Sequence, residues 1–207
     1  MTTGINRNQM ALLMIAGIPV MIILASTWLW YYVASGRLDL VGVLGTANRG
    51  TLVSPPLAIA DFAPVDALGR AFEPRDDRPL WRIVIPGGAH CDAGCEELLY
   101  YTRQIHTAMG KYANRIQRVY LAQDAAPGDS GLENLKQGYP GINLLYTSAP
   151  AITAARSADI AGQTGQGSKP GYYVMDPSGW LILSYAADAD GKDVMADLKF
   201  LLKNSNG

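Results

Sequence analysis

Charged residues are scarce in this 207-residue chain, at 17% of the sequence, and their signs nearly cancel to a formal net charge of −1. Soluble domains usually carry about 25% charged residues, so part of the chain is expected to avoid water. A surface that binds nucleic acid needs a broad positive field. Seventeen lysines and arginines against 18 aspartates and glutamates do not supply one. The composition therefore excludes nucleic acid as a partner.

Histidine is also rare, with only His90 and His106 in the chain. Two histidines and no nucleophile motif do not allow a Ser-His-Asp triad to be placed. The glycine-containing stretch 162–167 lacks the Lys-Ser/Thr ending of a phosphate-binding loop. The length leaves room for one globular domain with a sizeable core after any targeting segment.

A long apolar run stands near the N-terminus. No charged residue occurs between Arg7 and Arg37, and the run over 10–33 exceeds the roughly 20 residues that a membrane span needs. A cleaved signal peptide is the alternative, since Val33-Ala34-Ser35 resembles a cleavage site, but its apolar core normally has only about 7 to 15 residues. We predict an uncleaved transmembrane helix over 10–33, with a mild kink at Pro19.

Positive charges flank this run on both sides, so they scarcely decide its orientation. A short polar N-terminus, a long span and a C-terminal domain are the usual form of an N-in, C-out anchor. We expect residues 1–9 in the cytoplasm, a linker over 34–49 and a domain over 50–207 in the bacterial periplasm. The chain is thus predicted to be a single-pass protein of the inner membrane.

The pattern after the linker predicts an α/β domain with a central sheet covered on both faces. Residues 38–79 are rich in glycine and proline and predict short extended pieces, with a turn after Asp66. The turn signal Asp176-Pro177-Ser178-Gly179 predicts a hairpin. The expected strands are 80–85, 117–121, 172–175 and 180–185, and the expected helices are 95 to about 114, a short one within 124–140, a weak one over 152–160 and a C-terminal one.

The only two cysteines, Cys91 and Cys95, stand four positions apart between the first of these strands and its helix. A bridge that closes so short a ring stabilises a fold by only about 2 kcal/mol, against more than 4 for a long loop. At a helix N-terminus the dipole favours a thiolate, although Asp92, Glu96 and Glu97 oppose this effect. We therefore favour a functional pair and keep a structural bridge as the alternative.

The spacing of the pair leaves its chemistry open. Within a regular helix the two Cβ atoms would be about 5 to 6 Å apart, beyond the ~3.5 to 4.5 Å of a disulfide. A metal between two sulfurs tolerates that gap better. If Cys91 lies in the loop before the helix, either a disulfide or a metal site is open.

A strand, then Cys-x3-Cys, then a helix and a later Tyr-Val-Met-Asp-Pro-Ser-Gly hairpin resembles the thioredoxin-fold proteins of the Sco type. These are membrane-anchored and serve copper-site assembly in cytochrome c oxidase. The stretch 54–69 resembles the N-terminal extension of Sco and TlpA-type proteins, and the likeness covers most of 50–203. It implies a thioredoxin-like fold, with Cys91 and Cys95 as the copper ligands or the redox pair.

One departure from the Sco pattern concerns the third copper ligand. Sco proteins carry a histidine shortly before the hairpin, a place that falls here near Ser168 and Lys169, and no histidine follows His106. Pro170 stands instead where thioredoxin-like redox proteins carry a cis-proline that faces the cysteines. The likeness thus implies Pro170 as a third residue of the redox site.

The two histidines differ in whether they could replace the missing ligand. His106 stands eleven residues beyond Cys95 on the same predicted helix, about 16 Å away, too far to share a metal with it. His90 adjoins Cys91 and is the candidate to complete a copper site or to tune the thiolate. The candidate metal ligands are therefore Cys91, Cys95 and His90.

The predicted function is thiol–disulfide exchange, copper delivery, or both, in cytochrome c oxidase assembly. Cys91 would attack a partner disulfide and Cys95 would resolve the mixed disulfide, or the two thiolates would hold Cu(I). The absent distal histidine favours the redox role over stable copper binding. The expected partner is a respiratory oxidase subunit or another copper or thiol protein. The alternative is a non-catalytic accessory or scaffold protein with a static Cys91–Cys95 bridge, so an oxidoreductase activity stays an open prediction.

Overall fold

The chain separates into two compact units, Met1–Ala47 and Asn48–Gly207. The computed structural model describes residues 7–34, 48–75, 79–148 and 170–205.

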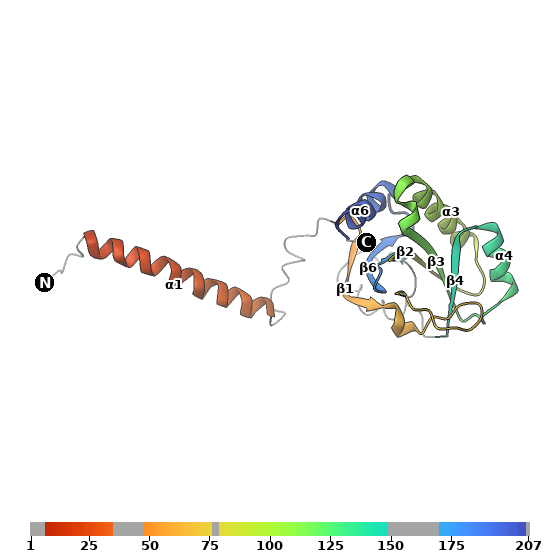
Figure 1. Ribbon diagram of the computed structural model, residues 1–207, viewed down its shortest axis with the longest axis horizontal. Helices are drawn as coiled ribbons and strands as arrows, with labels where there is room; N and C mark the ends of the chain where they lie inside the picture. The colour runs from red at the N-terminus through yellow and green to blue at the C-terminus, as the bar shows by residue number, and fades with distance from the viewer. Residues whose placement is uncertain (1–6, 35–47, 76–78, 149–169, 206–207) are drawn as a thin grey trace. The chain divides into compact units, whose positions relative to one another are not determined.

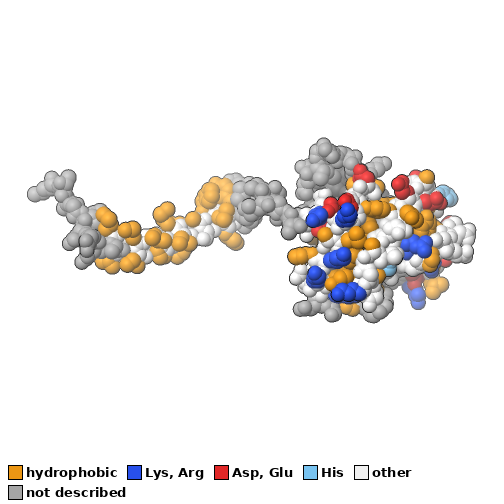
Figure 2. Space-filling model, turned by 90° about the horizontal axis from the view of Figure 1, so that it is seen from above, with side chains coloured by type: hydrophobic (Ala, Val, Ile, Leu, Met, Phe, Trp, Pro, Cys, Tyr) orange, Lys and Arg blue, Asp and Glu red, His pale blue; other side chains and the backbone are white. Residues whose placement is uncertain are grey.

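The described part of the first unit is helix α1, Arg7–Ala34 (Figure 1). Its segment Leu12–Tyr32 has a mean hydropathy of 2.2 and is long and apolar enough to cross a membrane. Hydrophobic side chains follow the helix along its length in Figure 2. The helix continues through Pro19, so this proline does not break it. The predicted apolar helix is thus present, and that it spans a membrane over 10–33 stays a prediction.

The second unit is built on a mixed six-stranded sheet with the order β1-β6-β5-β2-β3-β4. Strand β3 pairs in parallel with β2 and β4, whereas β5 pairs antiparallel with β2 and β6, and β1 pairs antiparallel with β6. The strands are β1 (Thr51–Ala58), β2 (Trp81–Gly87), β3 (Ile116–Gln123), β4 (Ile142–Thr147), β5 (Pro170–Met175) and β6 (Trp180–Ala186).

Three described helices pack on one face of this sheet (Figure 1). Leu99, Leu132 and Leu198, one from each helix, join Ile85 and Tyr120 of the central strands in the larger buried cluster. The helices are α3 (Ala93–Ala108), α4 (Ser130–Gly138) and α6 (Gly191–Asn204), and the 3-10 turn η2 (Gly110–Arg115) follows α3.

The N-terminal extension contacts the opposite face. The 3-10 turn η1 (Ile59–Phe62) buries Ile59 and Phe62 against Val84 and Tyr173, whose side chains alternate with those of the helix-covered face. The sheet is therefore covered on both faces, as the sequence predicted, by helices on one side and by the extension on the other.

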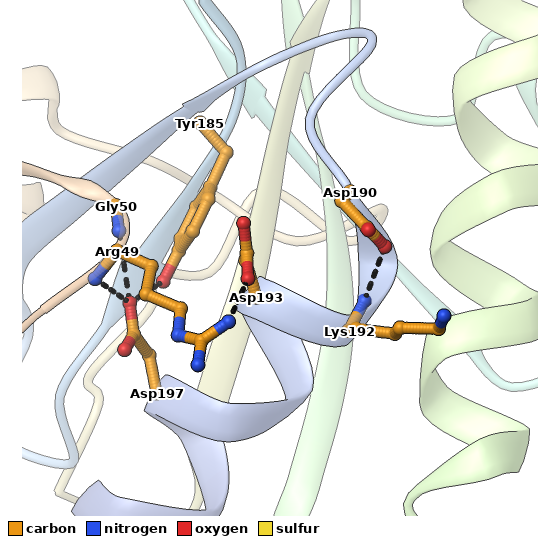
Figure 3. A network of polar contacts seen from close by, with 7 residues as sticks. All are labelled: Arg49, Gly50, Tyr185, Asp190, Lys192, Asp193 and Asp197. Carbon is orange, nitrogen blue, oxygen red and sulfur yellow. Dashed lines mark hydrogen bonds and ion pairs between the residues drawn. The ribbon is translucent and has the colours of Figure 1, made fainter.

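A buried carboxylate joins the start of the domain to α6 (Figure 3). Asp197 Oδ2 accepts hydrogen bonds from the backbone N–H groups of Arg49 and Gly50, both at 2.9 Å, and from the Tyr185 hydroxyl at 2.7 Å. Burial and the neighbouring Asp197 raise the pKa of Tyr185, which keeps its hydroxyl a donor. The Arg49 side chain forms an exposed ion pair with Asp193, one helical turn away.

Most of the predicted elements are present, with two differences. Strand β4 was not predicted, because residues 142–147 are a short apolar run without strict alternation, and periodicity alone does not separate such a run from a helix segment. The helix predicted to reach about 114 ends at Ala108, since Gly110 takes φ +55° and the chain continues as η2. The weak helix predicted over 152–160 lies outside the described residues.

Both predicted turns are confirmed by the carboxylates that stabilise them. Asp66 Oδ1 accepts from the N–H groups of Leu68 and Arg70. Asp176 Oδ1 accepts in the same way from Ser178 and Trp180, and Gly179 takes φ +96° between β5 and β6. Short acidic side chains that bond their own backbone are typical of such turns.

Candidate functional site

The two cysteines form a disulfide at the junction of β2 and α3. Cys91 lies in the loop before the helix, and Cys95 lies in its first turn. The Cα atoms are 5.2 Å apart, within the range that a disulfide spans. The four-residue spacing was compatible with a disulfide only if Cys91 lies outside the helix, and this is the position that Cys91 takes. Both residues are partly exposed and pack against the larger core.

Asp92 shapes the electrostatics next to the bridge. Its extended backbone makes it the N-cap of α3, and its carboxylate accepts a hydrogen bond from the Cys95 N–H at 2.9 Å. One of the free N–H groups of the helix N-terminus therefore faces a carboxylate instead of a cysteine sulfur. The negative charge of Asp92 at the N-terminus of α3 opposes the stabilisation of a thiolate by the helix dipole, as the sequence led us to expect.

Tyr120 of β3 lies beneath the bridge and was not singled out by the sequence. Its ring is fully buried, and its hydroxyl donates to the carbonyl oxygen of Gly88 at 2.9 Å. The same hydroxyl oxygen lies 3.7 Å from Cys95 Sγ. Burial, with a smaller effect of Asp92, raises the pKa of Tyr120 to about 12. The phenol is therefore neutral near pH 7.

The parallel register explains how Tyr120 reaches the cysteines. Ile85 is opposite Tyr120, and two residues further along the same face of β2 stands Gly87. A Cβ at Gly87 would stand 2.0 Å from the tyrosine hydroxyl oxygen. The absence of a side chain at Gly87 leaves the space that the phenol occupies. This contact depends on the register between two strands whose paired residues, such as Ile85 and Tyr120, are 35 positions apart in sequence, which no local motif reveals.

The remaining predicted site residues lie around the same end of the sheet. His90 is exposed, directly before Cys91. Pro170 is the first residue of β5. Because β5 runs antiparallel to β2, the start of β5 lies at the same edge of the sheet as the end of β2, which leads to the cysteines. The Lys169–Pro170 bond, and the place where a Sco histidine would stand, fall outside the described residues, so the cis-proline stays a prediction.

Within the described ranges, no group of three or more His, Cys, Asp or Glu side chains is placed to hold a metal ion. His106 is engaged elsewhere: its Nε2 lies 3.1 Å from the Ala113 carbonyl oxygen and 3.0 Å from that of Ile116, which fixes η2 against α3. The soft donors that the described site offers to a metal are the two cysteine sulfurs, once their bridge is reduced.

A cleft of about 250 Å³ opens between the first turns of α3 and the loop after β6, and its lining includes Gly94, the residue before Cys95, but neither cysteine. Two of its residues are acidic, so a partner segment that enters it meets negative charge next to Cys95. The lining residues are Gly94, Glu97, Leu98, Tyr101, Ala187 and Asp188.

Comparison with protein families gives one match. The family model described as transmembrane-like, thioredoxin-like, C-terminal domain matches residues 81–205, more than half of the chain. No curated protein matches the sequence.

Solved structures of thioredoxin-fold proteins superpose on most of the chain. Yeast Sco1 with copper bound has a TM-score of 0.53 at 17% identity, over 78% of this chain and 96% of that chain. Apo Sco1 from Thermus thermophilus has a TM-score of 0.53 at 18% identity, over 76% and 98%. A SCO1/SenC family lipoprotein from Bacillus anthracis has 0.51 at 16%, over 75% and 99%. At these identities the likeness concerns the fold, and it confirms the thioredoxin-like fold and the Sco resemblance that the sequence predicted.

Proposed function

The chain belongs to the family of transmembrane-like, thioredoxin-like C-terminal domains, and from this membership we propose that it is a membrane-anchored thiol–disulfide exchange protein. The observation that carries the proposal is the partly exposed Cys91–Cys95 bridge at the start of α3. A four-residue ring contributes little to stability. Its partly exposed position suits it to react with a partner.

The exchange proceeds in two steps. The Cys91 thiolate attacks a partner disulfide, forms a mixed disulfide and releases one partner thiol. Cys95 then attacks Cys91 Sγ, closes the intramolecular bridge and releases the second partner thiol. The partner disulfide is reduced and the Cys91–Cys95 dithiol is oxidised, so electrons balance. Cys95 suits the resolving role because its sulfur lies against Tyr120 at the buried side of the site.

Copper delivery is the second candidate, favoured by the likeness to yeast Sco1, which was solved with copper bound. Two thiolates select Cu(I) over harder cations, and His90 adjoins Cys91 as a further donor. The described residues do not gather three His, Cys, Asp or Glu side chains in a geometry that would hold a metal ion, so we place disulfide exchange first. Copper would here be a cargo that enters after the bridge is reduced.

The proposed location follows from α1 and the disulfide together. Residues 10–33 anchor the chain in a bacterial inner membrane, residues 1–9 lie in the cytoplasm, and a linker over 34–49 leads to a periplasmic domain over 50–207. The periplasm is an oxidising compartment in which such a bridge persists. The proposed partner is a respiratory oxidase subunit, or another copper or thiol protein, and the proposed process is cytochrome c oxidase assembly.

The test is the reduction potential of the bridge in the full-length chain in detergent micelles, with and without Cu(I). An exchange protein should titrate with glutathione between about −270 and −120 mV. Cys91→Ser should abolish exchange, and Cys95→Ser should accumulate the mixed disulfide. A potential below about −300 mV without copper uptake would support the accessory protein with a static bridge and overturn this proposal.

A further inference from the structure

Tyr120 is the one buried hydroxyl that the described part of the chain places against a cysteine sulfur. Its oxygen lies 3.7 Å from Cys95 Sγ and donates its hydrogen to the Gly88 carbonyl oxygen at 2.9 Å. The phenol oxygen keeps its lone pairs free to accept. In the oxidised protein the sulfur carries no hydrogen, so the Sγ–Oη approach is a contact without a hydrogen bond.

Reduction changes what this contact can do. Opening the bridge places a hydrogen on Cys95 Sγ, directly beside an acceptor that is already held in position by Gly88. A chain then forms in which the Cys95 thiol donates to the Tyr120 oxygen and Tyr120 donates to the Gly88 carbonyl. Hydrogen bonds in such chains polarise and strengthen one another. No movement of the tyrosine is required.

We propose that Tyr120 is a positioning residue for disulfide exchange, whose hydroxyl accepts a hydrogen bond from the Cys95 thiol and thereby stabilises the reduced form of the pair. The inference rests on the proposed exchange function and adds to it a residue outside the cysteine motif. It assigns Tyr120 a role in setting the reduction potential.

Two features mark the arrangement as built for this contact. Gly87 carries no side chain where a Cβ would stand 2.0 Å from the phenol oxygen. The ring is fully buried within the larger core, so its position is fixed by packing from both sides. The charged group that affects Tyr120 most closely is Asp92, whose carboxylate bonds the Cys95 backbone N–H.

The test measures the reduction potential of the full-length chain in detergent with mixtures of reduced and oxidised dithiothreitol. A dithiothreitol thiolate attacks one sulfur of the bridge, and its second thiol then closes the reagent's own ring. The reagent becomes a cyclic disulfide while both cysteine thiols are freed. This dithiol reduces even bridges of low potential, so a value is obtained whether or not the exchange function holds.

Tyr120→Phe removes the acceptor and keeps the ring. We expect the equilibrium to shift about fivefold toward the disulfide, a potential about 20 mV more negative. The Gly88 hydrogen bond is lost from both redox states, so a purely structural role cancels. Tyr139→Phe is the matched control, because its hydroxyl donates to the Glu96 carbonyl on the same helix at 3.3 Å, and it should leave the potential unchanged.

An unchanged potential in Tyr120→Phe overturns the inference, whereas a wild-type potential below about −300 mV overturns the exchange function instead. A second measurement needs no change at Tyr120. In Cys91→Ser the only thiol is Cys95, and its S–H stretching band should lie at lower frequency than that of a thiol without an acceptor. A band at the frequency of an unbonded thiol also overturns the inference.

Discussion

Because Gly87 lies against the Tyr120 side chain, adding a single methyl group at Gly87 is expected to destabilise the domain. A Cβ at Gly87 would meet three atoms of this side chain at 2.0 to 2.5 Å, whereas one at Gly88 would meet nothing nearer than 3.8 Å. We expect Gly87→Ala to lower the free energy of unfolding by about 1–3 kcal/mol through overpacking, and Gly88→Ala to change it little. Urea denaturation of both oxidised variants checks this. Equal losses would contradict it.

Arg118 is a buried cation that has no counter-ion within the described residues. Its Nη2 donates to the Pro140 carbonyl oxygen at 2.8 Å, but Nε and Nη1 have no hydrogen-bond partner among the described residues. Burial, and to a smaller extent the charge of Arg103, lower its pKa. Because desolvation of an unpaired charge is costly, we expect Arg118→Met to raise the free energy of unfolding by about 1 kcal/mol.

Arg115 provides the control for this substitution. Its guanidinium donates to the Leu202 carbonyl oxygen at 2.9 Å and to Ser205 at 3.3 Å, which connects η2 to the end of α6. Arg115→Met should therefore destabilise the domain. Chemical denaturation of the two variants side by side separates the effects, and a loss of stability in Arg118→Met would show that the Pro140 bond outweighs desolvation.

At the scale of elements, local signals account for much of the fold. The hydrophobic runs predicted β2, β3, β5 and β6, and the Asp176 turn set the hairpin. Local signals did not predict β4, and they did not show that the extension would cover the second face of the sheet, because both depend on partners distant in sequence. The cysteine pair divides in the same way: Cys91 and Cys95 stood out in the sequence as the only cysteines, between a strand and its helix, whereas the contact of Tyr120 with Cys95 required the β2–β3 register.

The junction between β1, β6 and α6 depends on Asp197. Its carboxylate accepts from Arg49, Gly50 and Tyr185, so Asp197→Ala leaves three donors without their acceptor. We expect the free energy of unfolding to fall by about 2–4 kcal/mol. Asp193→Ala, which removes only the exposed ion pair with Arg49, should have little effect. Thermal denaturation followed by circular dichroism compares the two.

A small effect of Asp197→Ala would mean that water or the Arg49 segment rearranges to satisfy these donors. Native-state hydrogen exchange at the Gly50 amide distinguishes this outcome. Protection of that amide should be lost in Asp197→Ala and retained in Asp193→Ala.

At the scale of the whole molecule, the low proportion of charged residues comes largely from one uncharged stretch near the N-terminus. The uncharged stretch belongs largely to α1, whose exposed side chains along Leu12–Tyr32 are apolar apart from Ser26 and Thr27, while the domain has an ordinary buried core. Composition and length therefore predicted an anchored single domain. The mixed composition could not say whether the apolar helix stays on the mature chain.

We expect α1 to be retained as an uncleaved anchor, because Leu12–Tyr32 is a 21-residue span with a mean hydropathy of 2.2, about the length that a bilayer requires and more than a signal-peptide core. After expression in a bacterial host, the full-length chain should stay with the membrane fraction through an alkaline carbonate wash and dissolve only in detergent. A variant that lacks residues 1–34 should appear in the soluble fraction. The intact mass of the purified protein decides the matter directly: a chain that begins near Ser35 would identify α1 as a cleaved signal and overturn the proposed membrane anchor.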